Sequence, residues 1–379
     1  MKRTKISALI LGFLLMTITA QVQDNKKPND ITGQYHLPPL AKPGQGAYLS
    51  GELLYPLDHK PAPGCHASTI VETPSGLVTA FFAGTDEGEP DVGIWVSRRN
   101  EGAWSWPEEV ADGVQNDTLR YPCWNPVLFL PDNGPLMLFY KVGPSPEEWW
   151  GMLMTSTDDG KTWSEPRKLG KNQKVGHLLG PVKNKPIQLA DGTILCPSSA
   201  EYTQDGERYW RVHFESTQDG GQTWQVVGPI NDGKEFDAIQ PRILTYPDGR
   251  MQALSRTRQD VISQSWSSDQ GKHWSEMTAT ALPNPNSGTD AVTLQDGRQL
   301  LVYNHTTKEG PQPNDRNMLN LAISEDGKHW NPVMTLENKP AKDGYSYPAI
   351  IQASDGLVHI TYTYRRESIK HVVVDPAKL

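Results

Sequence analysis

The chain has 379 residues with a formal net charge of −8, and it contains 33 Gly, 31 Pro, 12 Trp and 13 Tyr but only 7 Phe. A net acidic chain lacks the electropositive face that nucleic acid or an anionic lipid surface requires, which excludes both as partners. The many turn-forming residues, and the lack of a sustained 3.6-residue apolar period, predict an all-β protein with little helix.

The N-terminus has the pattern of an export signal. Basic residues at positions 2, 3 and 5 precede the apolar run 6–16, and small residues follow up to Ala20. The run is too short to span a bilayer, so we predict a cleavable signal peptide over residues 1–20, no membrane insertion, and a secreted or periplasmic protein. Residues 21–36 are polar and are predicted to form a poorly ordered leader.

Tight-turn glycines recur between β-rich segments along the rest of the chain, with steps of 58, 58, 57, 48 and 59 residues. They are Gly76, Gly134, Gly192, Gly249, Gly297 and Gly356. A strand-like run follows each glycine, for example Leu77–Phe82. Six similar β-hairpins are therefore predicted.

A second motif recurs out of phase with these glycines, as Ser or Thr, then Asp, Gly and Trp at fixed spacing. Its copies are 156–163, 217–224, 267–274 and a shorter one at 324–330. The hydroxyl and carboxylate can bind backbone donors, Gly allows an unusual backbone angle, and Trp covers the hairpin. Four copies of one turn indicate a structural role, because catalysis needs a single constellation.

Units of 50–60 residues, each with one such turn, fit the blades of a propeller better than the usually shorter repeats of a solenoid. We predict a single six-bladed β-propeller over residues 37–379, with a strand from residues 37–57 closing the ring against the last blade. The three cysteines, Cys65, Cys123 and Cys196, are far apart and lack metal-ligand spacing, so we predict buried thiols, no metal and no cofactor.

The recurrent turns are those of the Asp-box, or BNR, repeat, and with the sixfold spacing the chain resembles the sialidase superfamily over nearly all of residues 37–379. The resemblance implies three arginines around a substrate carboxylate, a tyrosine nucleophile with a glutamate partner, and an aspartate acid/base on a mobile loop. It implies a glycan substrate, and we expect a monomer.

The tyrosine motif of that family resembles Gly344–Ile350, which makes Tyr345 the candidate nucleophile, with Tyr347 as its rival. The segment 315–320 resembles an Arg-containing strand of the family and makes Arg316 a candidate carboxylate ligand. The strand pair after Gln240 resembles the pair that carries the middle arginine, which is Arg256 here.

Three positions depart from the family pattern or leave a choice. Asp237, with Glu235 beside it, stands at the glutamate position, and His66 replaces the arginine of the first-blade Phe-Arg-Ile-Pro motif. The acid/base position is taken by Asp91 or Asp86. A neutral imidazole offers one donor where a guanidinium offers a permanent charged fork, so strict specificity for sialic acid is in doubt.

The leading prediction is an exo-acting glycoside hydrolase that removes a terminal acidic sugar, either a sialic or ulosonic acid or a sugar linked to a uronate. A polysaccharide lyase, or an atypical glycosidase such as a rhamnosyl-uronate hydrolase, using His66 and Tyr345 as acid and base, is the first alternative. A non-catalytic carbohydrate-binding propeller is the second, and it is favoured if the Tyr345 hydroxyl lies far from Asp237, Glu235 and both arginines.

Overall fold

The computed structural model describes residues 36–308 and 316–379, which belong to one compact unit. The predicted signal peptide, and residues 21–35 of the predicted leader, lie outside the described residues. The described part contains six antiparallel sheets of four or five strands and a short two-stranded hairpin, and its one helix is a single 3₁₀ turn, η2 (Pro376–Lys378). No helix in this part is long and apolar enough to cross a membrane.

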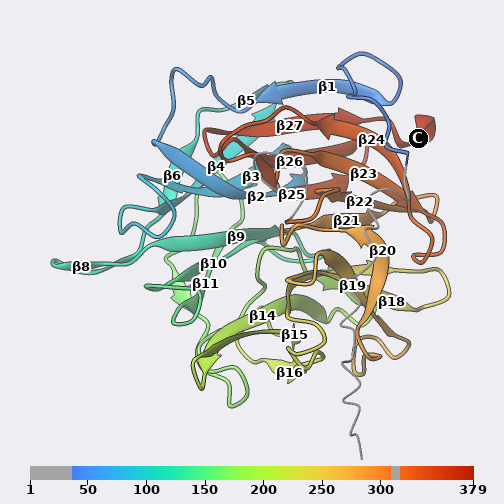
Figure 1. Ribbon diagram of the computed structural model, residues 1–379. Coiled ribbons are helices and arrows are strands. Elements are labelled where there is room, and N and C mark those ends of the chain that lie inside the picture. The colour runs from blue at the N-terminus through green and yellow to red at the C-terminus, as the bar shows by residue number, and fades with distance from the viewer. Residues whose placement is uncertain (1–35, 309–315) are drawn as a thin grey trace, which may run out of the picture. The chain divides into compact units, whose positions relative to one another are not determined.

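The sheets follow one another along the chain as the blades of a propeller (Figure 1). Blade 1 contains β2 (Gly64–Thr73), β3 (Gly76–Gly84), β4 (Gly93–Asn100), β5 (Ala103–Trp104) and β6 (Glu108–Ala111). Blade 2 contains β9 (Cys123–Phe129), β10 (Leu136–Val142), β11 (Trp150–Ser156) and β12 (Arg167–Lys168). Blade 3 contains β13 (Ile187–Gln188), β14 (Ile194–Gln204), β15 (Glu207–Thr217) and β16 (Gln225–Val227).

Blade 4 contains β17 (Ala238–Thr245), β18 (Met251–Thr257), β19 (Val261–Ser267) and β20 (Thr278–Pro283). Blade 5 contains β21 (Asp290–Thr293), β22 (Gln299–Tyr303), β23 (Leu319–Ser324) and β24 (Asn331–Glu337). Blade 6 contains β25 (Tyr345–Gln352), β26 (Val358–Tyr364), β27 (Ser368–Val374) and β1 (Tyr48–Leu53). Strand β1 pairs with β27, so the N-terminal strand completes the last blade, as predicted. The hairpin of β7 (Val114–Asn116) and β8 (Leu119–Arg120) projects between blades 1 and 2 (Figure 1).

Local turn chemistry shapes the blades as the sequence predicts. All six predicted hairpin glycines have positive φ, between 82° and 138°, and join the first and second strands of their blades. In the Asp-box of blade 3, the Thr217 hydroxyl donates to Asp219, the Asp219 carboxylate accepts from the Thr223 N–H at 2.9 Å, and the Trp224 indole donates to the Gly221 carbonyl at 3.0 Å. The motif is a turn staple.

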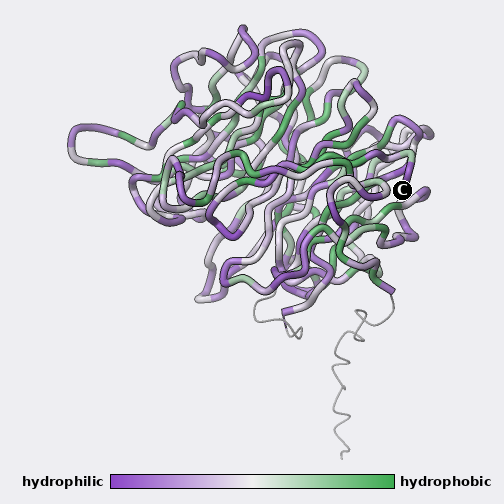
Figure 2. The backbone as a smooth tube through the Cα atoms, turned by 90° about the horizontal axis from the view of Figure 1, so that it is seen from above, coloured by the Kyte–Doolittle hydropathy of each residue, from purple (hydrophilic) through white to green (hydrophobic). Residues whose placement is uncertain are grey.

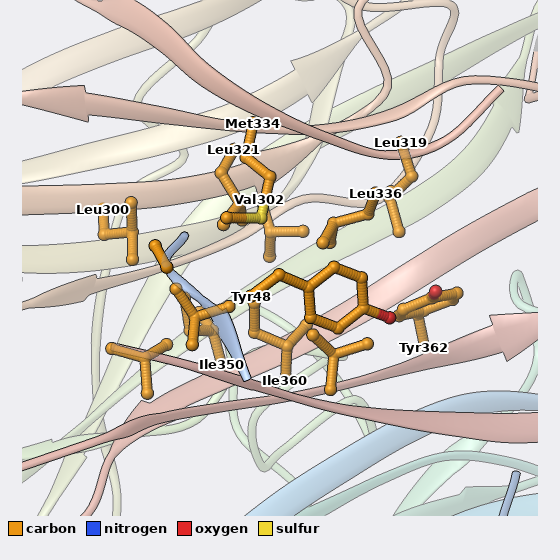
Figure 3. Packing of buried hydrophobic residues seen from close by; sticks show 14 of the residues in the cluster. Tyr48, Leu300, Val302, Leu319, Leu321, Met334, Leu336, Ile350, Ile360 and Tyr362 are labelled. Carbon is orange, nitrogen blue, oxygen red and sulfur yellow. The ribbon is translucent and has the colours of Figure 1, made fainter. Parts of the chain in front are cut away.

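Clusters of buried apolar side chains join neighbouring blades. Hydrophobic residues concentrate along the inner strands, and many of the outer loops are hydrophilic (Figure 2). One cluster joins blades 5 and 6, where Tyr48 and Tyr362 pack against aliphatic side chains such as Leu321, Leu336 and Ile360 (Figure 3). Cys65, Cys123 and Cys196 are all buried free thiols, which confirms that prediction.

Blade 6 contains a buried pair of stacked imidazoles that predicts acid lability. His359 Nδ1 and His371 Nε2 are 3.0 Å apart, and burial, with the neighbouring His359 and Arg99, lowers the pKa of His371 to about 3. Because the unfolded chain binds this proton near pH 6.5, stability is present above pH 6.5 and is lost as the pH falls towards 3, at about 1.4 kcal/mol per pH unit. Urea denaturation at pH 7 and pH 5 measures the effect.

The His371→Gln variant is the control for this prediction, because it removes one of the two titrating groups. Its free energy of unfolding should change less between pH 7 and pH 5 than that of the wild type. Equal slopes in the two proteins would assign the acid lability to other groups.

Candidate functional site

The innermost strands of four blades begin with the same irregularity. In β2, β9, β17 and β25 the pairing register shifts around one residue with positive φ, and these residues are Ala67, Asn125, Gln240 and Tyr347. A β-bulge of this kind redirects a side chain and is common beside active sites. Gln240 and Tyr347, from blades 4 and 6, meet in consequence, with the Gln240 Nε2 3.3 Å from the Tyr347 hydroxyl.

Tyr347 is the centre of a cluster of polar side chains. Its hydroxyl oxygen accepts hydrogen bonds from Arg256 Nη1 at 2.7 Å and from the Gln240 amide. The ring of His66, from blade 1, lies against it with a centroid distance of 4.1 Å. We name Tyr347, His66, Gln240 and Arg256 the central cluster.

Tyr345, the predicted nucleophile, is not part of the central cluster. Its side chain is 2% exposed and packs in the apolar core of blades 5 and 6, with its ring 5.3 Å from that of Tyr364. Burial and the nearby Glu337 raise its pKa to about 12. No hydrogen bond joins its hydroxyl to Asp237, Glu235 or an arginine in the described part, so the structure brings Tyr347, and not Tyr345, to Arg256.

Both predicted arginines lie in or beside the central cluster. Arg256 Nε donates to the Asn286 side chain at 3.0 Å, and Arg316 Nη2 donates to the Asn286 carbonyl at 3.3 Å, so one residue bridges them. Arg256 is 6% exposed, with its guanidinium 5.2 Å from the Trp210 ring. Its hydrogen-bond partners in the described residues are Tyr347, Gln240 and Asn286, none of which is a carboxylate.

A third arginine, which the sequence analysis missed, lies beside His66. Arg366 is in the turn between β26 and β27, and its carbonyl accepts from the N–H of Cys65, the residue before His66. Its Nη2 is 2.7 Å from Glu87. Burial lowers the pKa of His66 well below its usual value, and the charge of Arg366 is the next largest cause, ahead of Arg316 and Arg256. Burial and these positive charges therefore favour the neutral form of His66.

The predicted carboxylates occupy different surroundings. Asp237 is buried and forms an ion pair with Arg258 at 2.7 Å, and it accepts from the Trp210 N–H at 2.6 Å, so it is engaged away from Tyr347. Glu235 is exposed. Asp91 lies in the loop 85–92 between β3 and β4, where it is exposed and accepts from Thr85 at 2.7 Å. Glu87 of the same loop binds Arg366, so this loop borders the cluster.

One sequence signal would have located the cluster. A proline follows the bulged residue in three of the four strands, as Asn125-Pro126, Gln240-Pro241 and Tyr347-Pro348. Proline cannot donate to the strand ladder, and within sheets it is confined to edges, first residues and bulges. A proline near the start of a predicted inner strand therefore marks the residue directly before the proline as the bulged one, whose side chain departs from the regular alternation between the two faces of the strand.

Comparisons with known proteins agree with the fold. A protein of unknown function from Dyadobacter fermentans has a TM-score of 0.70 at 17% identity, covering 86% of this chain and 98% of that one. The NanB sialidase from Streptococcus pneumoniae has a TM-score of 0.64 at 12% identity, covering 84% and 69%. Both likenesses show the propeller fold.

The sequence comparisons identify the family. A sialidase of Bacteroides fragilis is 26% identical over 245 residues, which are 60% of this chain and 41% of that relative, so the chain matches less than half of its length. The family model of the BNR repeat-like domain matches residues 75–360, about three quarters of the chain. The chain therefore belongs to the BNR repeat-like family, as a sialidase-like six-bladed propeller.

Proposed function

We propose that this protein is a glycoside hydrolase of the sialidase type that removes a terminal acidic sugar from a glycan. The observation that carries the proposal is Arg256, a buried guanidinium whose hydrogen-bond partners are all neutral. A buried guanidinium that donates to no carboxylate of the protein can bind a substrate carboxylate through bidentate hydrogen bonds. Arg316, joined to it through Asn286, would bind the same group.

Tyr347 is the residue that we assign to the chemistry. The Tyr347 hydroxyl oxygen accepts hydrogen bonds from Arg256 and Gln240. Its own hydrogen is still available to donate to a substrate. A sialic or ulosonic acid has its carboxylate on the anomeric carbon, so Arg256, by binding that carboxylate, would place the anomeric carbon near the Tyr347 hydroxyl to which it also donates. Asp91, on the bordering loop 85–92, stays our candidate for the acid/base that protonates the leaving oxygen.

The decisive experiment is a screen of released monosaccharides. The purified protein is incubated with sialylated, uronate-containing and rhamnose-capped glycans, and free sugars are identified by chromatography with mass detection. The proposal expects release of one sugar unit from the non-reducing end of an acidic glycan. Release from neutral glycans alone would contradict it.

A second candidate function, elimination next to a uronic acid, is favoured by Gln240. The side chain beside Tyr347 is an amide and cannot take a proton from it, whereas a tyrosine nucleophile needs a base. In elimination, neutral His66 would take the proton α to the carboxylate, the carbon–oxygen bond to the leaving sugar would break, and Tyr347 would protonate that oxygen. The product is an unsaturated uronide with new ultraviolet absorbance, which hydrolysis does not produce.

The Gln240→Glu substitution tests whether anion binding depends on Arg256 having only neutral hydrogen-bond partners. A carboxylate at this position would pair with Arg256, which now donates to the Gln240 oxygen at 3.1 Å. We expect the Kd or KM for acidic sugars to rise about tenfold or more, because the guanidinium would already be neutralised. Steady-state kinetics, or calorimetry with an acidic product sugar, measures the change.

The control is Gln222→Glu, which adds the same charge in the exposed Asp-box turn of blade 3. We expect the Kd or KM of this variant to stay within about twofold of the wild type, because exposed charges are largely screened at that distance. If both variants bind acidic sugars equally well, Arg256 does not act as the anion ligand.

A further inference from the structure

Lys183, just before β13 of blade 3, is a buried lysine beside the central cluster. It is 4% exposed, and its φ of 69° lies in the left-handed region that residues with a β-carbon disfavour. A β-carbon on Gly288, just before β21 of blade 5, would lie 3.2 Å from Lys183 Cε. The same point is 3.4 Å from Gln240 Oε1 and from Tyr347 Cδ2, so the Lys183 side chain lies next to two members of the cluster.

The Lys183 ammonium donates all three of its hydrogens to oxygens of the protein. Nζ donates to the Pro348 carbonyl at 2.6 Å, to the Thr289 carbonyl at 2.5 Å and to the Asn184 side-chain oxygen at 2.9 Å. Pro348 directly follows Tyr347 within the bulge of β25, so one of these bonds holds that bulge. The acceptors come from blades 6, 5 and 3, and one buried ammonium therefore joins three blades.

Asn184 extends this arrangement to blade 4. Its Nδ2 donates to the carbonyl of Gln240 at 3.0 Å and to that of Pro241 at 3.1 Å, which are the bulged residue of β17 and the proline after it. Two consecutive side chains of blade 3 thus bind the bulges of β17 and β25. These are the bulges from which Gln240 and Tyr347 reach each other.

We infer that Lys183 is a positioning residue for the chemistry proposed for Tyr347, because its bond to the Pro348 carbonyl holds the Tyr347 hydroxyl against Arg256. This inference rests on the proposed function and deepens it. Lys183 does not itself bind the substrate, since its hydrogens are already donated to the protein. A misplacement of a reacting group by about 1 Å can cost about 100-fold in rate, so the loss of this ammonium should lower kcat more than it weakens binding.

The test compares Lys183→Met with Lys141→Met in the full-length protein. Lys141 is 1% exposed, and its ammonium likewise donates to three carbonyls, those of residues 178, 179 and 180, none of them in a strand of the central cluster. Both variants lose a buried ammonium, so circular dichroism should show a similar loss of stability. We expect kcat on the acidic glycan from the screen to fall about 30- to 100-fold in Lys183→Met and less than about threefold in Lys141→Met.

Binding separates positioning from a general loss of the site. Arg256 and Arg316 keep their guanidinium groups in Lys183→Met, so we expect the Kd of the acidic product sugar, measured by calorimetry, to stay within about threefold of the wild type. Equal losses of kcat in the two methionine variants overturn the inference.

The pH dependence of turnover provides a measurement on the unsubstituted protein. Burial is the main cause that lowers the pKa of Lys183 to about 7; the charge of Asp290 opposes it and nearby cations support it. The cations are Lys185, Arg242 and Arg256. A neutral amine has two hydrogens for three acceptors, so one bond is lost as the pH rises through 7. We expect wild-type kcat to fall about tenfold between pH 6 and pH 8.5.

His66, whose ring lies against Tyr347, does not account for such a decline. Burial lowers the pKa of His66 well below its usual value, so its neutral form is favoured over this whole range. Lys183→Met should lack the decline and Lys141→Met should keep it. A wild-type kcat that stays constant over this range overturns the inference, even where Lys183→Met does not fold.

The crystal structure of Lys183→Met tests the inference without any turnover. We expect the Tyr347 hydroxyl, which is 2.7 Å from Arg256 Nη1 in the wild type, to move away by about 1 Å or more. An unmoved Tyr347 overturns the inference. A displaced Tyr347, in a protein that releases no sugar from any glycan, would support the positioning role of Lys183 while contradicting the proposed hydrolase.

Discussion

Tyr347→Phe is expected to lower turnover by about 100- to 10,000-fold, the range for loss of a group that transfers a proton or forms a covalent bond to the substrate. The hydroxyl of Tyr347 is hydrogen-bonded to Arg256 at 2.7 Å, and the His66 ring lies against its own ring. The substitution removes one oxygen from the position where the anion ligand and the reacting group would meet. Turnover is measured on whichever acidic glycan the screen identifies.

Tyr345→Phe is the matched control, two residues away in the same strand. Its ring lies in the core of blades 5 and 6, so we expect turnover within about twofold of the wild type and a stability change below about 1 kcal/mol. Circular dichroism should show both variants folded. A large loss of turnover in Tyr345→Phe with none in Tyr347→Phe would return the chemistry to Tyr345.

Asp290→Ala is expected to destabilise the protein by about 3–5 kcal/mol, because it leaves buried cations without their carboxylate. Asp290 begins the inner strand of blade 5 and contacts three other blades. It accepts from Lys185 at 2.5 Å and from the Ile350 N–H at 2.9 Å, and it lies 3.3 Å from Arg242 Nε. Burial would raise the pKa of Asp290, but the nearby Lys185, Arg242 and Lys183 hold it below its usual value.

The measurement is chemical denaturation followed by tryptophan fluorescence. Asp296→Ala is the control, since Asp296 belongs to the same blade and pairs with Arg298 at 2.7 Å but is half exposed. An exposed ion pair contributes little, so we expect a loss below about 1 kcal/mol. Similar losses in the two variants would show that the buried network around Asp290 does not stabilise the ring.

Much of the fold could be predicted because the signals are local. Each hairpin glycine and each Asp-box staple is a turn whose hydrogen bonds lie within eight residues, so the sequence alone specifies its geometry. Repetition then indicates the number of blades, and the closing strand follows from the leftover segment before the first repeat. The structure confirms the six blades and the pairing of β1 with β27.

The site could be predicted only in part. Arg256, Arg316 and His66 were found through the family resemblance, and the structure gathers them. Tyr345 was preferred to Tyr347 on the family's tyrosine motif alone, and regular alternation would place both residues on the same face of a strand and so does not separate them. The bulge between Ser346 and Ala349 breaks that alternation, so Tyr345 enters the core and Tyr347 the central cluster.

The sequence by itself determined the blade repeat, the turns that build it and the net acidic character of the chain. Only the tertiary structure decided which side chains meet at the centre, because ring closure brings together residues as distant as His66, Gln240, Tyr347 and Arg366. Arg366 shows the reason most clearly. Its contact with Glu87 spans 279 positions of the chain, and no local period or turn signal encodes a distance that exists only once the last blade lies beside the first.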